Sequence, residues 1–377
     1  MNRHRNAEGV NPAGAQGTPD PDERRWPRLL NGILRGQDLG TAEAAWAMDQ
    51  VMRGEVGPAR LAALLVGLRA KGETVAELTG FVRGMMAHAV PLHVPGPTVD
   101  IVGTGGDGAD TVNVSTMAAL VAAGAGARVV KHGNRASTSR SGSADVLECL
   151  GVRLTLPPAR VGALVEEVGI TFCFAPDFHP AMRHARGVRR ELGVPTVFNA
   201  LGPLTNPAAP AALAVGVADP RLVPLVAGVL AARGVRALVF RGDDGLDELS
   251  VSAGSTVVSV GGGRLCEERL DPRDLGIERA ARDALLGGDV THNAAVVRRV
   301  LAGERGPVRD AVLLAAAAAL AAGEDAAGRT VTARLAAALG RAAASVDSGA
   351  AAGVLDAWIA ASRRHAGEAA EAALTAA

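Results

Sequence analysis

The chain has 377 residues, enough for two domains at the usual size of about 150 residues each. Hydrophobic residues make up 48% of it, but aromatic residues supply only 2% and Tyr is absent, which argues against an aromatic surface that stacks nucleic-acid bases. The 39 Lys and Arg residues balance the 39 Asp and Glu residues, so no overall positive field favours nucleic acid as a partner.

The N-terminal segment, residues 1–26, is predicted to be a disordered tail. It is rich in Gly, Pro, Asn and charge, and it cannot bury enough surface to offset its ordering entropy. Two early charges, Arg3 and Arg5, are followed by no apolar run, so the segment is not a secretory signal.

Residues 27–95 carry only helical patterns and are predicted to form a small all-helical domain. Pro58 opens one run at the first-turn position, where its missing N–H group is harmless, and Gly72 follows the run. Thr74 and Glu77 have the spacing of a capping box that begins the next helix.

Beyond residue 95, short apolar runs alternate with segments of helix length, which is typical of a mostly parallel sheet flanked by helices. The predicted strands are residues 99–102, 128–130, 153–156, 170–174, 212–217 and 237–240. The stretch 180–205 interrupts this alternation and is expected to return to the helical unit, so the larger α/β domain comprises 96–179 and 206–377. The predicted class is α/β, with a small N-terminal all-helical domain and a larger domain built on a central sheet.

Two other features limit the location of the protein. The longest apolar run, residues 311–322, is shorter than the roughly 20 residues that span a bilayer, so no membrane partner is expected. Cys149, Cys173 and Cys266 are too far apart for a disulfide framework or a paired metal motif, which indicates a reducing, cytoplasmic location.

The first loop that could bind a ligand follows the predicted strand 99–102. Gly103 to Gly108 matches a dinucleotide-binding glycine pattern, but a polar stretch precedes the next helix, and the second strand leads into Lys131 rather than an acidic residue. The glycines instead suit an anion cradle, with Asn113, Ser115 and Thr116 at a helix start. The alternative is that Asn113 and Ser115 are ordinary helix caps.

The second loop, residues 131–143, combines cations, hydroxyl groups and glycines. Lys71 and Lys131 are the only lysines among the 39 basic residues, so a Lys kept at a strand end indicates a need for a compact ammonium group. Two such loops side by side could hold two phosphate groups. A solvated polar loop is the alternative.

Two further groups of charges suggest a metal and an organic acid. Asp247 and Glu248 follow the predicted strand 237–240, and Mg²⁺ binds through one or two carboxylates together with substrate phosphates. Arg189 and Arg190 lie in a helical stretch between Pro-rich turns, where a guanidinium could bind a carboxylate through two hydrogen bonds. The alternatives are a solvated acidic loop and an ordinary surface helix.

Together these motifs resemble those of the anthranilate phosphoribosyltransferase family of the tryptophan pathway, over roughly residues 28 to 340. The matching segments, in chain order, are 103–107, 113–116, 131–135, 142–145, 179–182, 188–193 and 247–248. That family transfers the phosphoribosyl group of phosphoribosyl pyrophosphate (PRPP) to the amino group of anthranilate, giving N-(5-phosphoribosyl)anthranilate and pyrophosphate. The resemblance implies a Mg²⁺-dependent enzyme without a covalent nucleophile, usually a homodimer that associates through its helical parts.

The resemblance also assigns residues to each ligand. Anthranilate would contact Gly103, Asn134 and Arg189, with His179 and Pro203 along its channel, and Mg²⁺ would be bound by Ser115, Asp247 and Glu248. PRPP would be bound by Gly103, Gly106, Asp107, Thr111, Asn113, Val114, Ser115, Thr116, Lys131, His132, Gly133, Asn134, Arg135, Ala136, Ser137, Thr138, Ser139 and Ser143.

Four positions depart from the family pattern: Ser137, Thr138, Arg241 and Ala315. Two other functions share the fold, namely a pyrimidine nucleoside phosphorylase and a non-enzymatic relative that binds nucleic acid. The first would not call for the 188–190 run or the 247–248 pair, and the second predicts a basic stripe that the balanced charge does not supply.

Overall fold

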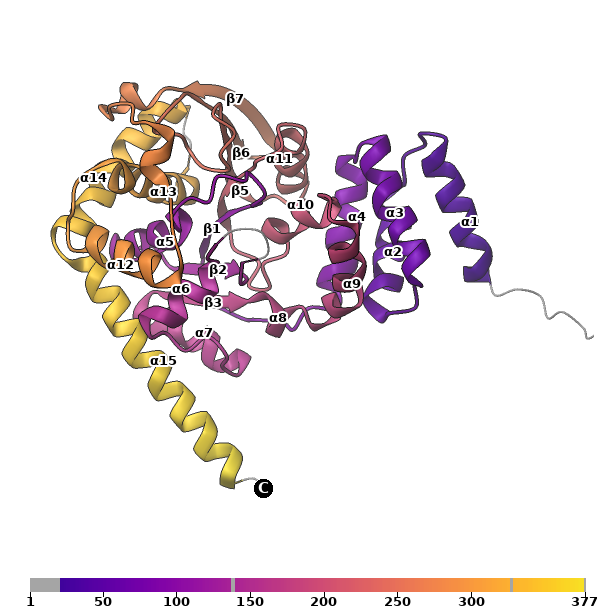
Figure 1. Cartoon of the computed structure of the whole chain (residues 1–377), viewed down its shortest axis with the longest axis horizontal. Coiled ribbons are helices and arrows are strands. Elements are labelled where there is room, and N and C mark those ends of the chain that lie inside the picture. Colours follow the sequence, from indigo (N-terminus) through magenta and orange to yellow (C-terminus); the bar gives the residue numbers. More distant parts are fainter. Residues whose placement is uncertain (1–20, 137–139, 326–327, 376–377) are drawn as a thin grey trace, which may run out of the picture.

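The computed structural model describes residues 21–136, 140–325 and 328–375 and consists of a helical unit beside a larger α/β unit (Figure 1). The predicted tail lies outside the described residues up to residue 20. Its boundary at residue 26 is wrong, because helix α1 (Pro21–Leu34) already includes Trp26. The ring of Trp26 packs 5.2 Å from that of Trp46, and Arg25 lies over the same Trp46 ring, so this segment has the apolar partners that a tail lacks.

The helical unit comprises α1 and the helices α2 (Thr41–Arg53), α3 (Pro58–Lys71) and α4 (Val75–Met86). The capping box of Thr74 and Glu77 is confirmed at the start of α4. Helices α2 and α4 pack closely because α4 carries Gly80 and Gly84 where a Cβ atom would meet the backbone of α2. Small residues at a helix crossing bring the two backbones together in this way.

A seven-stranded sheet forms the centre of the larger unit, in the order β3-β2-β1-β4-β5-β6-β7. The first five strands in that order run parallel, and β6 and β7 extend the sheet as antiparallel strands. The predicted α/β class with a mostly parallel sheet is confirmed. The strands are β1 (Val99–Gly103), β2 (Val129–Gly133), β3 (Ile170–Phe174), β4 (Ala212–Gly216), β5 (Arg236–Gly242), β6 (Ser255–Gly261) and β7 (Arg264–Leu270).

The strand predicted at 153–156 is wrong. The segment alternates buried and exposed residues as a strand would, yet it pairs with no strand of the described sheet. The backbone N–H of Arg153 donates instead to Ser362 Oγ on helix α15 (Ala350–Thr375), and Leu154 and Leu156 pack with Trp358 of that helix. Helix α15 thus supplies a hydrogen bond and apolar contacts to this segment, in place of a neighbouring strand.

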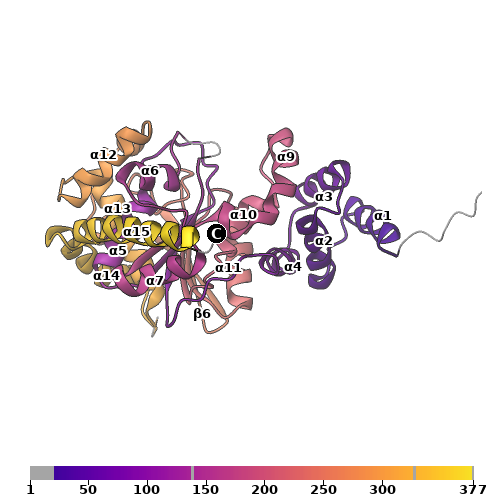
Figure 2. The same ribbon diagram turned by 90° about the horizontal axis from the view of Figure 1, so that it is seen from below.

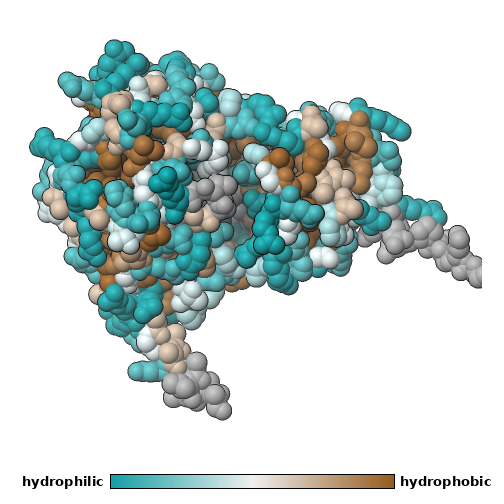
Figure 3. Space-filling model, in the orientation of Figure 1, coloured by the Kyte–Doolittle hydropathy of each residue, from teal (hydrophilic) through white to brown (hydrophobic). Residues whose placement is uncertain are grey.

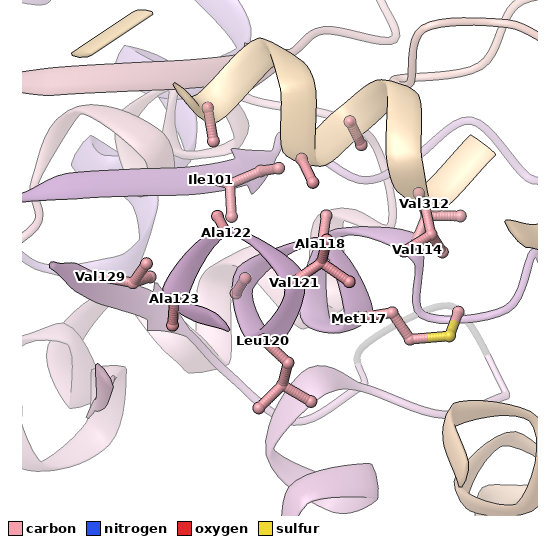
Figure 4. Packing of buried hydrophobic residues seen from close by; sticks show 14 of the residues in the cluster. Ile101, Val114, Met117, Ala118, Leu120, Val121, Ala122, Ala123, Val129 and Val312 are labelled. Atoms are coloured by element: carbon pink, nitrogen blue, oxygen red, sulfur yellow. The ribbon is translucent and has the colours of Figure 1, made fainter. Parts of the chain in front are cut away.

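Helices cover both faces of the sheet, and the alternation of side chains along the strands separates two cores. Helices α5 (Val114–Gly124) and α13 (Pro307–Gly323) pack on one face, where Ile101 of β1, Met117 of α5 and Val312 of α13 belong to one buried cluster (Figure 4). Helix α11 (Leu222–Ala232) covers the other face, and its core continues into the helical unit through α4.

The remaining helices surround these layers (Figure 2). After β3, the chain crosses to the helical unit, where α9 (Arg183–Leu192) contacts α2 and α3 and α10 (Val197–Leu204) contacts α4. No described helix is long and apolar enough to cross a membrane. The other elements are α6 (Ser143–Leu150), α7 (Pro158–Val168), α8 (Ala175–Phe178), α12 (Val290–Leu301), α14 (Val331–Asp347) and the 3-10 turns η1 (Pro180–Met182), η2 (Pro272–Leu275) and η3 (Arg282–Leu285).

Candidate functional site

The candidate site lies at the carboxyl ends of the neighbouring strands β1, β2, β4 and β5, where ligands bind in open parallel sheets. The glycine loop 103–113 leaves β1, and the acidic loop 243–248 leaves β5. These loops meet directly, since the N–H of Gly105 donates to Asp247 Oδ2 at 2.7 Å.

Two strand-end glycines make room for the acidic loop. A Cβ atom on Gly103 would overlap the side-chain carboxylate of Asp247, and one on Gly216 would overlap its carbonyl oxygen. Gly105, Gly106 and Gly108 have φ values of 66°, 82° and 65°, a region that favours glycine. The glycine pattern is therefore explained by this close approach and by a left-handed loop.

Three carboxylates gather where the two loops meet. Asp247 and Glu248 reach the surface in part, but their carboxyl groups are surrounded by protein. Burial, followed by the charge of Asp107, raises the pKa of Asp247 to about 6, and burial and Asp247 raise the pKa of Glu248 well above its usual value. Like charges held together in this way favour a bound cation.

These carboxylates suit a Mg²⁺ ion whose remaining ligands are phosphate oxygens of a substrate. Asp107 Oδ2 is buried without a hydrogen-bond partner among the described residues, so it is free to accept one. Within residues 21–136, 140–325 and 328–375, no three His, Cys, Asp or Glu side chains form a complete metal site. Mg²⁺ commonly keeps few protein ligands and completes its shell with water and phosphate oxygens, so an incomplete protein site fits this ion.

Lys131 lies beneath this cluster, only 2% exposed. Its Nζ donates to Ile101 O at 2.6 Å and to Ser115 Oγ at 3.1 Å, which joins the end of β1 to the start of α5. Burial lowers the pKa of Lys131, whereas the nearby carboxylates of Asp100 and Glu248 raise it. Lys131 and His132 were expected in a loop but belong to β2, because their backbones pair with β3.

Asp100 is a residue that the sequence reasoning missed. It is fully buried on β1, and its carboxylate accepts from Asn206 Nδ2 at 2.8 Å and from the N–H of His132 at 3.3 Å. Burial raises its pKa to about 6, although the charge of Lys131 opposes that rise. A single acid inside the apolar run 99–102 was the available signal, because a buried carboxylate requires a partner.

The glycine loop and the loop after β2 are connected by Asn113. Its Nδ2 donates to Ser141 O at 3.1 Å, and its Oδ1 accepts from Asn293 of α12 at 2.9 Å. The side chain of Asn113 does not cap α5, so the interpretation of this residue as an ordinary helix cap is wrong. Asp110 and Arg140 form a second connection, with 3.4 Å between their charged atoms.

The loop after β2 is fastened to α6. Asp145 Oδ2 accepts from the N–H groups of Ala136 and Gly142, at 3.1 and 3.0 Å. The exposed Arg135 forms ion pairs with Asp145 and Glu148, so in this structure its guanidinium is occupied by protein. The predicted ligands Ser137, Thr138 and Ser139 lie outside the described residues.

The other predicted PRPP ligands are distributed around this edge of the sheet. Thr116 is buried and its hydroxyl has no hydrogen-bond partner in the described part of the chain, whereas Val114 is buried and could contribute only backbone. Asn134 is exposed at the start of the second loop, and Ser143 opens α6 close to Gly133 at the end of β2. Thr111 forms an isolated antiparallel bridge with Leu286.

A second group of predicted residues lies on the return of the chain, along α9 and α10. The Arg189 guanidinium lies 5.0 Å over the ring of Phe198, and no carboxylate in the described part of the chain pairs with it. Burial lowers the pKa of Arg189, but a guanidinium remains charged. This arrangement is suited to an incoming carboxylate.

Two buried histidines connect the strand ends to α10. His132 Nδ1 donates to Gly202 O at 3.1 Å, His179 Nε2 donates to Thr205 O at 2.7 Å, and the two rings lie 5.2 Å apart. Burial lowers the pKa of both, that of His132 to about 3, so both are neutral. Pro203 is buried in the same stretch of α10, so these three predicted residues are brought together.

Family models match both units of this architecture. Residues 95–352 match the a/b domain of a glycosyl transferase family, and residues 27–89 match the helical bundle domain of a glycosyl transferase family. Among curated proteins, the chain is 60% identical over 338 residues to an anthranilate phosphoribosyltransferase from Arthrobacter sp. (strain FB24), covering 90% of this chain and 96% of that protein. It is also 60% identical over 339 residues to the enzyme of that name from Streptomyces griseus, with coverage of 90% and 96%.

Solved structures are similar over the same extent. Anthranilate phosphoribosyltransferase from Thermus thermophilus has a TM-score of 0.82 at 47% identity, covering 89% of this chain and 99% of that one. The Saccharomyces cerevisiae enzyme in complex with PRPP and Mg has a TM-score of 0.81 at 27% identity, covering 91% and 99%.

Proposed function

This chain belongs to the anthranilate phosphoribosyltransferase family, whose enzymes transfer the phosphoribosyl group of PRPP to anthranilate with Mg²⁺, and we propose which residues perform each part of that transfer. The observation that carries the proposal is the separation of charge in the site. A cluster that combines carboxylates with Lys131 lies at the strand ends, and Arg189, which no described carboxylate pairs, lies on the returning helices.

The strand-end cluster binds PRPP. The N–H groups of the glycine loop and the start of α5 face the pyrophosphate, and Lys131 supplies a buried positive charge beneath them. Ser115, Asp247 and Glu248 hold Mg²⁺, with Asp107 close by. The ion neutralises phosphate charge when it is bound.

The loop after β2 and its neighbours complete the PRPP site. The predicted set is Gly103, Gly106, Asp107, Thr111, Asn113, Val114, Ser115, Thr116, Lys131, His132, Gly133, Asn134, Arg135, Ala136 and Ser143. For Arg135 to reach PRPP, its ion pairs with Asp145 and Glu148 must open.

The reaction requires no covalent nucleophile from the protein. The bond between ribose C1 and the pyrophosphate oxygen breaks with its electron pair leaving on pyrophosphate, and the amine nitrogen forms the new bond to C1. Negative charge grows on the leaving group, where Lys131 and the loop N–H groups stabilise it. The aromatic amine is neutral at pH 7, so it attacks before it loses a proton, and the site contributes by aligning the two reactants.

Anthranilate binds on the side of the returning helices. Arg189 pairs with its carboxylate while stacked on Phe198, and His179 and Pro203 line its approach. Gly103 and Asn134 contact it from the strand ends. The neutral histidines leave Arg189 as the group that recognises the negative charge.

The remaining features of the proposal concern the whole molecule. We propose that residues 21–95 and 180–205 act as one unit and residues 96–179 and 206–377 as the other, a division supported by the packing of α9 on α2 and α3. A homodimer through the helical unit is supported by the exposed apolar residues of that unit, Leu34 at 79% and Val66 at 47%. Apolar surface is also visible over the helical unit on the face drawn in Figure 3. Three unpaired cysteines support a cytoplasmic location.

A fluorescence assay tests the activity directly. The protein is mixed with anthranilate, PRPP and Mg²⁺, and the loss of anthranilate fluorescence is followed while pyrophosphate is measured. We expect one pyrophosphate for each anthranilate consumed, and no reaction when PRPP or Mg²⁺ is omitted. Consumption without pyrophosphate release would overturn the proposed reaction.

A further inference from the structure

A pair of opposite charges joins the helical unit to the edge of the sheet where the strands end. Arg69, in the last turn of α3, donates from Nη1 to Asp219 Oδ2 at 2.9 Å. Asp219 lies in the loop between β4 and α11, and the two side chains are only partly exposed, at 30% and 23%. Neither residue belongs to the site described above.

Asp219 is held on its own side of this contact by Arg221. Its Oδ1 accepts from the backbone N–H and from Nε of Arg221, at 3.0 and 3.3 Å, and its Oδ2 accepts from Arg221 Nη2 at 3.1 Å. Partial burial opposes ionisation of Asp219, but the hydrogen bonds from Arg221 and Arg69 outweigh it and lower the pKa of this carboxyl group to about 2. The carboxylate is therefore charged at neutral pH and is presented to Arg69 in one orientation.

The residue before Asp219 connects the same loop to both loops of the proposed PRPP site. The N–H of Ala218 donates to Thr104 Oγ1, in the glycine loop, at 3.1 Å. The carbonyl oxygen of Ala218 accepts from Arg241 Nε at 2.8 Å. Arg241, one of the positions that depart from the family pattern, ends β5 together with Gly242, directly ahead of the acidic loop. The loop that carries Asp219 is therefore bonded to the glycine loop and to the base of the acidic loop.

Arg69 is connected to the proposed anthranilate site from the other side. It belongs to α3, and α9, the helix that carries Arg189, packs on α3. The pair of Arg69 and Asp219 thus lies between the helix that supports the anthranilate site and the loop that is bonded to the PRPP site.

Apolar packing also joins the two units, but it does not fix their relative position as closely. Helix α4 of the helical unit packs on α11 of the larger unit (Figures 1 and 2). Apolar contact is not directional, whereas an ion pair with hydrogen bonds sets both a distance and a direction. The charged pair is therefore the contact that is suited to fix how the helical unit lies against the strand ends.

We propose that Arg69 and Asp219 are positioning residues for the transfer reaction, which hold the helical unit where the amine of anthranilate faces C1 of PRPP. This inference rests on the function proposed above, because it concerns two substrates that are bound by different units. Neither side chain is assigned a contact with a substrate. Since a misplacement of about 1 Å can cost a hundredfold in rate, the pair affects the rate of transfer more than the affinity for either substrate.

Asp219→Asn and Arg69→Gln, singly and together, remove the charged pair. An ion pair that water reaches contributes little to stability, so the variants are expected to fold, and urea unfolding checks this. The transfer rate is measured in a single turnover with PRPP, Mg²⁺ and enzyme in excess over anthranilate. Calorimetry gives the affinity for PRPP, and initial rates give the KM for anthranilate. The matched control is Asp38→Asn, which removes the ion pair of Asp38 with Lys71 inside the helical unit.

We expect each single variant to lower the single-turnover rate about fivefold or more, while the affinity for PRPP and the KM for anthranilate stay within about twofold of wild type. The double variant should be no slower than the slower single variant, because both changes remove the same contact. Asp38→Asn keeps the wild-type rate. An unchanged rate in Asp219→Asn, losses that multiply in the double variant, a loss of affinity in place of rate, or an equal loss in Asp38→Asn would overturn the proposal.

Amide hydrogen exchange separates this proposal from the function on which it rests. Residues 216–222 include the N–H of Ala218, which should exchange faster in Asp219→Asn and Arg69→Gln than in wild type or Asp38→Asn. If the proposed function is wrong, wild type itself consumes no anthranilate and the positioning role falls with it, whereas the difference in exchange still shows that the pair joins the two units. If only the positioning role is wrong, wild type is active and the variants match its rate.

Discussion

The strand-end cluster and the arginine site on α9 differ in whether the protein itself supplies partners for their charged side chains. At the strand ends, Lys131 is buried among Asp100, Asp247 and Glu248, and loop glycines hold the carboxylates close together. On α9, Arg189 faces an aromatic ring and no acidic residue of the described ranges. One site is built around charges that the protein largely supplies itself, and the other keeps a charge available for a ligand.

This difference indicates which kind of ligand each site is suited to bind. A polyphosphate arrives with a metal ion, so its site needs carboxylates for the ion as well as donors for the phosphate. A monocarboxylate arrives alone, so its site needs one cation that no protein acid occupies. Changes in the two regions should therefore affect different substrates.

The largest effect is expected at the acidic loop. The double variant Asp247→Asn with Glu248→Gln keeps the shape of both side chains but removes the charges that bind Mg²⁺. We expect turnover to fall at least about a thousandfold and the residual rate to become insensitive to Mg²⁺. Initial rates over a Mg²⁺ titration measure this, and a normal rate in the variant would exclude both carboxylates from the mechanism.

Gly216→Ala should have the next largest effect. The added methyl group overlaps the carbonyl oxygen of Asp247, so the acidic loop must move. A displacement of about 1 Å can cost a hundredfold in rate, and overpacking lowers the free energy of unfolding by about 1–3 kcal/mol. The matched control is Gly261→Ala at the end of β6, where no described atom lies within 4 Å of the new group. Equal activity of the two variants would contradict the proposed steric role.

Asp100→Asn should change how stability depends on pH. The pKa of Asp100 is raised from 3.8 to about 6, so the folded state binds the proton more tightly than the unfolded state. Protonation of Asp100 therefore stabilises the folded state by about 3 kcal/mol. This stabilisation is complete below about pH 4 and is lost as the pH rises through about 6. Urea unfolding from pH 4 to pH 7 should show that the wild type loses this much more stability than the variant. Parallel curves would show that Asp100 does not titrate in this range.

Arg189→Ala should have a smaller effect that is confined to one substrate. Losing a charged hydrogen bond costs about 1.5–3 kcal/mol, which raises the KM for anthranilate about ten- to a hundredfold. The KM for PRPP should stay close to that of the wild type. The exposed neighbour Arg190 provides the control variant Arg190→Ala, and an unchanged KM for anthranilate in Arg189→Ala would refute the assigned role.

Much of the fold could be predicted because local patterns matched the tertiary contacts. The parallel strands were evident as apolar runs since both faces of this part of the sheet are covered. The edge strand β7 was missed because most of its residues are exposed, and the segment 153–156 was misassigned because Trp358, far along the chain, covers it. Neither the position of β7 at the sheet edge nor the contact with Trp358 leaves a signal in the local sequence.

In the site, too, some residues could be identified from the local sequence, whereas others depend on contacts between distant segments. The loops and the acidic pair could be located because each follows a strand. The role of Gly216 and the burial of Asp100 could not, because they depend on how β1, β4 and β5 lie side by side. Asn113 was ambiguous for the same reason, since its partners Ser141 and Asn293 are distant in the sequence.

The affinity for PRPP with Mg²⁺, measured by calorimetry on Lys131→Gln and Arg189→Ala, tests the separation of the two sites most directly. Circular dichroism first establishes that both variants are folded. The account predicts that Lys131→Gln binds PRPP about ten- to a hundredfold more weakly than wild type while Arg189→Ala binds it normally. Equal losses in the two variants, or a loss in Arg189→Ala alone, would contradict it.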